Sequence, residues 1–183
     1  MRREIEAFVA HESIQVSQEW QDVLQVGLRT CDAVVALVTP NFKESDWTNQ
    51  EIGIATAHGK LVVPLRFGGD PHGFFAKYQA LTIKGGDEYR EIARKLFEAF
   101  AGHDLTKQRM ADVLVRKFIE SGSYDEVRSR FVALKMVPKE AWTQRLAAEL
   151  REACEENREI KEGQIDWQPA PEVVNNLLAS VGI

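Results

Sequence analysis

The chain has 183 residues, of which 28% are charged and 44% hydrophobic, and its formal net charge is −5. This length is enough for one domain, or one domain with a small appendage, around an apolar core. The modest acidic charge gives no electrostatic footprint for nucleic acid or anionic lipid, so we expect neither nucleic acid nor a membrane as a partner. Residues 1–4 lead into a short strand, so we expect no signal peptide. The two cysteines form no disulfide or metal framework, which favours a reducing compartment and a cytoplasmic location.

The first predicted elements are a strand, a polar loop and a helix. The strand covers Ile5–Ala10, the loop follows at its carboxyl end, and the helix Gln18–Arg29 carries apolar residues at helical spacing. Ligands bind at the carboxyl ends of strands in open parallel sheets. His11 could therefore donate to a phosphate or ribose, and Glu12 could accept from a hydroxyl. The alternative for both side chains is a solvated loop.

A βαβ unit is predicted next. The near-continuous apolar run Ala33–Val38 is rich in β-branched residues, as is typical of a strand buried on both faces of a parallel sheet. Ser45 or Asp46 can cap the helix that follows, and Gly59 closes it. Leu61–Leu65 is the second strand, and the crossover is expected to be right-handed.

Later segments predict a short edge strand and then helices alone. The strand is Leu81–Ile83, and Asp87 is expected to cap an amphipathic helix after it. From Gly102 onward the periodicity is helical only. Helices are expected to begin at Thr106, at the capping box of Ser123 and Glu126, at Pro138 and at Pro171, with a loop over Asn157–Gln168.

One carboxylate in the predicted βαβ unit lies on an apolar stripe. Glu51 is four residues after Trp47, so the two share a helix face that continues to Ile54, Ala55 and His58. A carboxylate half withdrawn from water, near the carboxyl end of a strand, is a candidate for chemistry. The alternative is a glutamate at the edge of the stripe that pairs with a lysine or arginine.

Several segments, taken together and in this order, resemble a TIR (Toll/interleukin-1 receptor) domain of the bacterial type. They are Ala7–Glu12 with Glu19 and Trp20, Cys31–Asp32, Thr39–Pro40, Phe42, Ser45–Trp47, Glu51–Gly53, Pro64–Arg66, Gly69–Phe74 and Gln79–Leu81. The resemblance extends over about residues 4–100. It implies an α/β fold with a flavodoxin-like parallel sheet in residues 1–102, followed by a small all-helical region in residues 103–183.

The resemblance also implies a departure from the family. A TIR domain normally begins one strand and one helix earlier than Ile5, so the domain is expected to be truncated at its N-terminus. In the family that strand lies between the strands seen here as 5–10 and 33–38, and its loop lends polar residues to the substrate pocket. A start set too late, a gap filled by a partner or by rearrangement, and an incomplete site all remain open.

For function, the resemblance implies an NAD⁺ hydrolase that depends on self-association and acts in bacterial defence or virulence signalling. Many TIR domains cleave NAD at the nicotinamide–ribose bond, and the family's catalytic glutamate matches Glu51. Trp47 would border the pocket or, in the alternative, anchor the helix. NAD would be the substrate, with no cofactor and no metal, and the protein partners would be further copies or other TIR domains.

Two other functions stay open. One is a non-catalytic TIR adaptor or scaffold that acts through TIR–TIR contacts; the other is a generic flavodoxin-like binder of a small ligand. Other enzyme classes lack their motifs, because the four histidines have no metal-ligand spacing and the chain contains neither a G-x-S-x-G elbow nor a P-loop.

Overall fold

The computed structural model describes residue 7 and residues 20–183. The predicted loop with His11 and Glu12 lies outside the described residues, as does all but residue 7 of the predicted strand 5–10. The chain divides into two compact units, one ending at Ala99 and one extending from Phe100 to Ile183. That boundary falls inside a helix, Tyr89–Gly102, and the predicted division after residue 102 stays a prediction.

The first unit is built around a parallel sheet, as predicted. Its elements are α2 (Trp20–Thr30), β1 (Ala33–Val38), the 3₁₀ turn η1 (Phe42–Glu44), α3 (Asp46–Ala57), β2 (Leu61–Arg66), η2 (Gly73–Phe75), β3 (Leu81–Thr82) and the start of α4 (Tyr89–Gly102). The described strands lie in the order β1-β2-β3 and all run parallel. β1 and β2 are in register from Ala33 opposite Leu61 to Val38 opposite Arg66. The apolar runs and the helix between them predict this parallel βαβ arrangement, and it agrees with the flavodoxin-like α/β fold that the resemblance implies.

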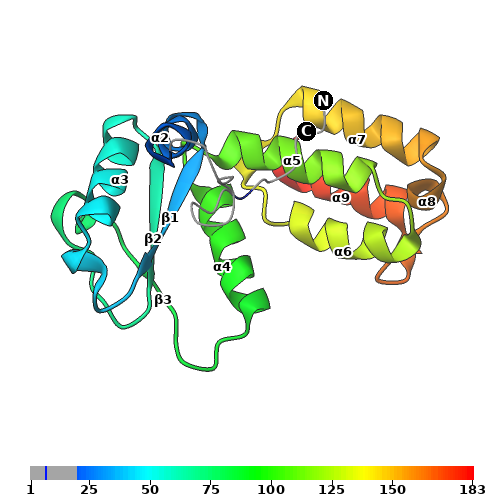
Figure 1. Cartoon of the computed structure of the whole chain (residues 1–183). Helices are drawn as coiled ribbons and strands as arrows, with labels where there is room; N and C mark the ends of the chain where they lie inside the picture. Colours follow the sequence, from blue (N-terminus) through cyan, green and yellow to red (C-terminus); the bar gives the residue numbers. More distant parts are fainter. Residues whose placement is uncertain (1–6, 8–19) are drawn as a thin grey trace. The chain divides into compact units, whose positions relative to one another are not determined.

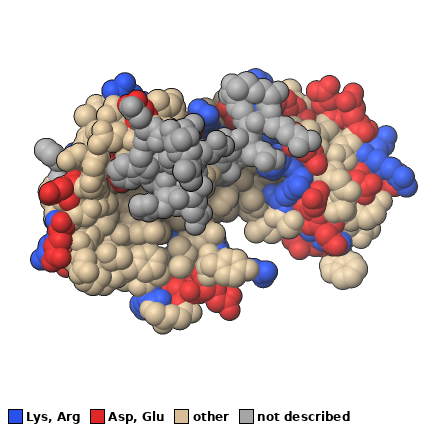
Figure 2. All heavy atoms as spheres, viewed as in Figure 1, with Lys and Arg blue, Asp and Glu red and all other residues tan. Residues whose placement is uncertain are grey.

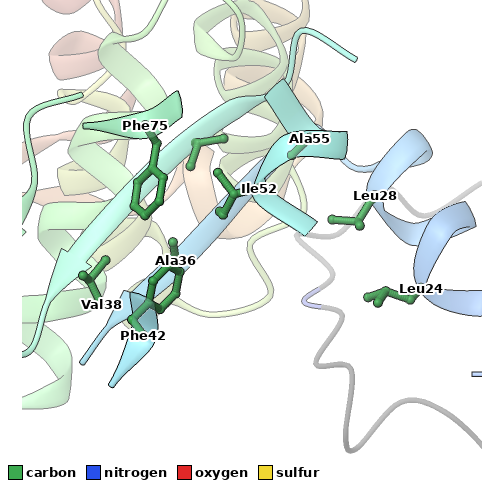
Figure 3. Close-up of a cluster of buried hydrophobic side chains, with 9 residues drawn as sticks. Leu24, Leu28, Ala36, Val38, Phe42, Ile52, Ala55 and Phe75 are labelled. Atoms are coloured by element: carbon green, nitrogen blue, oxygen red, sulfur yellow. The ribbon is translucent and has the colours of Figure 1, made fainter. Parts of the chain in front are cut away.

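The core of the first unit lies between the sheet and the helices α2 and α3. Figure 3 shows how side chains from β1, α3 and α2 converge there. The buried members of the cluster are Leu24, Leu28, Ala36, Val38, Phe42, Ile52, Ala55, Val62 and Phe75. α3 contributes Ile52 and Ala55 to this core, which fixes the rotation of the helix and therefore the direction of its other faces.

The second unit is helical apart from one small hairpin. Its elements are α5 (Lys107–Ile119), α6 (Tyr124–Leu134), η3 (Lys139–Ala141), α7 (Gln144–Glu156), α8 (Arg158–Lys161), β4 (Gln164–Ile165), β5 (Gln168–Pro169) and α9 (Ala170–Val181). The helix predicted from Pro138 begins instead at Gln144, where Thr143 accepts a hydrogen bond from the Leu146 backbone. The predicted loop at 157–168 is wrong, because that segment contains α8 and the antiparallel pair β4–β5.

The second unit has its own apolar core. Its largest side chains without solvent exposure, or nearly so, are Val115, Phe118, Val127, Phe131, Leu134, Leu146, Leu150, Ile160 and Leu178. On the face shown in Figure 2, acidic and basic side chains are interspersed over its helices. None of the described helices is both long enough and apolar enough to cross a membrane.

Candidate functional site

Helix α3 carries the candidate carboxylate, and its first turn is fixed by side-chain hydrogen bonds. Ser45 is the N-cap, and its Oγ accepts from the Thr48 backbone N at 3.3 Å. Asn49 Nδ2 donates to the backbone oxygens of Lys43 at 3.3 Å and Ser45 at 3.0 Å. These bonds satisfy backbone groups at the helix start and tie α3 to the turn η1. The sequence prediction of a cap at Ser45 or Asp46 is therefore confirmed for Ser45.

His72 holds the same turn from the loop that follows β2. Its Nε2 lies 2.9 Å from Asn49 Oδ1. Because Asn49 Nδ2 already donates to two carbonyls, Oδ1 is the acceptor, and His72 must carry its hydrogen on Nε2. The His72 ring packs at the edge of Phe42, with centroids 6.0 Å apart. His72 thus positions α3, a role that sequence reasoning did not assign to it.

Trp47 and Glu51 line one hollow between α2 and α3. The hollow measures about 130 Å³. Glu51 is half-buried there, and Trp47 is 45% exposed. Its lining residues are Gln21, Leu24, Gln25 and Leu28 from α2, and Trp47, Gln50, Glu51 and Ile54 from α3. Of the predicted stripe, Ile54 lines this hollow together with Trp47 and Glu51, whereas Ala55 is buried in the core. His58 is exposed at the C-cap and lines neither this hollow nor the next.

A second hollow, of about 370 Å³, lies along β1 on the other side of Glu51. It is bordered by Val34, Val35, Ala36, Leu37, Thr39, Asn41, Phe42, Ser45, Thr48, Glu51 and Ile52. Four of these residues supply a hydroxyl or amide group near the carboxyl end of β1: Thr39, Asn41, Ser45 and Thr48. This is where ligands bind in open parallel sheets. Glu51 is the one residue common to both hollows.

The second hollow is thus lined by one carboxylate, by apolar residues of β1 and by several hydroxyl and amide groups. Such a carboxylate can accept hydrogen bonds from ligand hydroxyls and can stabilise a developing positive charge beside it. Sequence reasoning found Glu51 and Trp47 through their spacing of four. It did not assign a ligand role to Thr39, Asn41 or Thr48, because isolated polar residues at a strand end carry no periodic signal.

The cysteine of the first unit is not poised as a nucleophile. Cys31 lies between α2 and β1, and partial burial raises the pKa of its thiol despite the opposing effect of Lys60. A raised pKa reduces the fraction of thiolate, which is the reactive form. Within the described part of the chain, no group of three or more His, Cys, Asp or Glu side chains is placed to hold a metal ion.

The fold and the site together define a flavodoxin-like α/β domain with a half-buried carboxylate on the helix that follows β1. A family model described as TIR domain matches residues 1–97, which is more than half of the chain. The chain therefore belongs to the TIR domain family, as the resemblance predicted. No curated protein matches it significantly, and neither does any solved structure.

Proposed function

We propose that this TIR domain protein hydrolyses NAD at the bond between nicotinamide and ribose, with Glu51 as the catalytic carboxylate. The observation that carries the proposal is the placement of Glu51, which is half-buried on α3 and borders both hollows, the second of which extends along β1 to its carboxyl end. Membership of the TIR domain family supports the same assignment. The resemblance described above implies that Glu51 corresponds to the glutamate that many TIR domains use for this reaction.

The chemistry requires little more than such a carboxylate. When the C–N glycosidic bond breaks, its electron pair neutralises the pyridinium nitrogen, so nicotinamide leaves as a neutral molecule without a general acid. The ribose carbon becomes oxocarbenium-like, as in glycoside hydrolysis. Glu51 would stabilise this charge and hold the ribose hydroxyls, and water would then add to the carbon and release a proton. The products are nicotinamide and ADP-ribose, or a cyclised form if a ribose or adenine group replaces water.

Trp47 would border the nicotinamide end of the site or hold α3 in place. His11 and Glu12, proposed as substrate contacts, lie outside the described residues. We further propose self-association of TIR domains as a requirement for activity, and a role in bacterial defence or virulence signalling. A cytoplasmic setting fits the two free cysteines, which a reducing compartment keeps unpaired.

The second candidate function is a non-catalytic adaptor or scaffold that acts through TIR–TIR contacts. The small size of the hollow shared by Trp47 and Glu51 favours it, because that hollow measures only about 130 Å³. Pockets for small molecules usually measure about 300–1,000 Å³, so a dinucleotide would need the second hollow as well or a site completed by further residues.

The deciding experiment is nicotinamide release from NAD at high protein concentration, with Glu51→Gln and Glu44→Gln in parallel. Both variants remove one negative charge, but Glu44 lies on η1 outside both hollows. We expect Glu51→Gln to lower the rate by about 100-fold or more and Glu44→Gln to leave it unchanged. If the folded parent protein releases no nicotinamide, the proposal of a hydrolase is overturned and the scaffold function is favoured. An equal loss of nicotinamide release in both variants, or no loss in either, would overturn the role of Glu51.

A further inference from the structure

The second unit presents a tryptophan to solvent at the tip of a hairpin. Trp167 lies in the two-residue turn between β4 and β5 and is 94% exposed, the highest value among the large apolar side chains described. By contrast, Trp142 in the same unit is buried and donates its indole N–H to the Val137 oxygen. An indole is costly to leave fully in water, and tryptophan is among the residues most enriched at binding hot spots.

The backbone holds Trp167 outward at a conformational cost. Asp166 and Trp167 both lie in the left-handed region, with φ of 50° and 67°. Two-residue hairpin turns of this kind usually contain Asn-Gly or Gly-Gly, because residues with a β-carbon are disfavoured there. The cost is of order 1 kcal/mol or more for each such residue. Strain at an exposed position that contributes no packing suggests a functional role for the side chain.

The base of the hairpin is rigid, so the tip is presented in one place. Ile165 is buried at 3% exposure and Ala170 at 0%. The Ala170 backbone N donates to the Gly163 oxygen at 2.9 Å, which closes the hairpin. A β-carbon on Gly163 would lie 2.4 Å from the Glu159 oxygen, so only glycine permits this close approach to α8. An anchor side chain on such a support loses little entropy when it binds.

The same end of the second unit also carries Tyr124, Arg158 and Glu162. Together with Trp167 they form what we call the hairpin patch. Tyr124 begins α6 and Arg158 begins α8, and both reach Glu162 just before the hairpin. Tyr124 Oη donates to Glu162 Oε2 at 3.3 Å, and Arg158 Nε donates to the same oxygen at 3.2 Å. Figure 1 shows the first turn of α6, α8 and the β4–β5 hairpin at one end of this unit, in agreement with the contacts of α6 with both α8 and β4.

We propose that the hairpin patch is a self-association surface that docks onto the same patch of a second copy of this chain. A two-fold contact requires a patch that is complementary to itself. The hairpin patch meets this condition because it combines aromatic rings with both signs of charge, so Arg158 of one copy can face the acidic side chains Glu162 and Asp166 of the other. Tryptophan, tyrosine and arginine are also the residue types that dominate binding hot spots.

The charges favour a second copy over the other possible occupants. Asp166 precedes Trp167 directly, and Glu159 on α8 and Glu162 at its C-cap lie beside the basic residues Arg158 and Lys161, so acidic groups outnumber basic ones here by three to two. These acidic groups oppose insertion of the tip into an anionic lipid surface and oppose contact with nucleic acid. The contact would pair two copies through their second units, and it does not rest on NAD hydrolysis.

The test compares the parent chain with Trp167→Gly and Val132→Ala by sedimentation equilibrium over a micromolar concentration range without NAD. Glycine accepts the left-handed turn, so Trp167→Gly should leave the free energy of unfolding equal or higher while it weakens dimerisation by about tenfold or more. Val132 on α6 is 63% exposed but lies outside the patch, and its truncation should leave the dimer unchanged.

A second variant, Arg158→Glu, makes the patch uniformly acidic and should also weaken the dimer, more so at low salt. A parent chain that stays monomeric throughout this range would overturn the proposal. So would self-association that is equally strong in the parent and in Trp167→Gly, because another surface would then be responsible. Either result leaves the assay of nicotinamide release to be judged separately.

Discussion

Asn157 makes four hydrogen bonds that join two helix ends of the second unit. Its Oδ1 caps α8 by accepting from the backbone N of Glu159 at 2.8 Å and of Ile160 at 3.3 Å. Its Nδ2 donates to the oxygens of Ile119 at 2.8 Å and Ser121 at 3.0 Å, at the end of α5. One amide side chain therefore satisfies donors and acceptors that would otherwise be left at two helix termini.

We predict that Asn157→Ala lowers the free energy of unfolding by about 2–4 kcal/mol, because it removes the cap and leaves two carbonyl groups without a partner. Asn157→Asp retains the cap but faces those carbonyls with a carboxylate, so it should also be destabilising. Asn176→Ala on the exposed side of α9 is the control, with an expected change within about 0.5 kcal/mol. Urea denaturation measures all three, and an Asn157→Ala variant as stable as the control would contradict the role of this residue.

Residue roles were predictable where one side chain decides the local structure. The N-cap at Ser45 and the pairing of Ser123 with the Glu126 backbone follow from local sequence and are confirmed. The predicted cap at Asp87 is wrong: its carboxylate accepts from the Lys84 backbone N and pairs with Lys95, and the bond from Ile92 goes to the Glu88 oxygen. The Asn157 bonds to α5 join residues 36 and 38 positions apart, which no local pattern can indicate.

At the scale of elements, the loop after β2 packs directly against the end of β1. The backbone N of Phe67 and that of Gly69 both donate to the Val38 oxygen, at 2.8 and 3.2 Å. A β-carbon on Gly69 would lie 2.2 Å from the Thr39 oxygen. This contact involves backbone on both sides, so a larger residue can be accepted only if the loop or the strand end moves. Because Thr39 borders the second hollow, the movement would reach the candidate site.

We predict that Gly69→Ala destabilises the first unit by about 1–3 kcal/mol, the usual cost of overpacking. Gly53→Ala is the matched control: it lies inside α3, where an added β-carbon meets nothing within 4 Å. That change should stabilise the protein by about 0.5–1 kcal/mol, because alanine loses less backbone entropy in a helix. The midpoints of urea denaturation of the two variants should shift in opposite directions from that of the parent protein. A Gly69→Ala variant at least as stable as the parent would show that the loop moves to make room for the β-carbon at no cost in stability.

Elements with strong apolar periodicity were predictable, and short ones were not. β1, α3 and β2 appear where the apolar runs predict them, because burial on a sheet imposes a pattern that the sequence must satisfy. α8 has four residues and β4 has two, and each has a single buried apolar residue, Ile160 and Ile165. Such elements exist through their tertiary contacts and the Asn157 cap, so a periodicity argument predicts a loop there.

At the scale of the whole molecule, the candidate site and the appended helices belong to two units with separate cores. Sequence reasoning predicted a sheet domain followed by helices, from the change in periodicity near Gly102. It could not predict the two hollows around Glu51, since their shape depends on how α2, α3 and β1 pack. The roles of Glu51, Trp47, His11 and Glu12 stay predictions.

Each unit contains one free cysteine, so thiol reactivity reports on the two units separately. Cys154 on α7 is 8% exposed, and burial raises the pKa of its thiol to about 11 from an ordinary 9.0. At pH 8 this shift alone lowers the thiolate fraction by about 100-fold. Burial also raises the pKa of Cys31, but that residue is only half-buried. In the native protein we therefore expect Cys154 to be the slower of the two to react, with a rate that still rises with pH as the thiolate forms.

We predict that Cys31 becomes reactive at a lower urea concentration than Cys154. The described core of the second unit contains many more side chains without solvent exposure than that of the first, so opening the second unit exposes more apolar surface. Labelling at pH 8, with each cysteine followed by mass spectrometry, gives one transition for each unit. Transitions at the same urea concentration would show that the units unfold together. A Cys154 transition that comes first would contradict the prediction and show that the second unit is the less stable of the two.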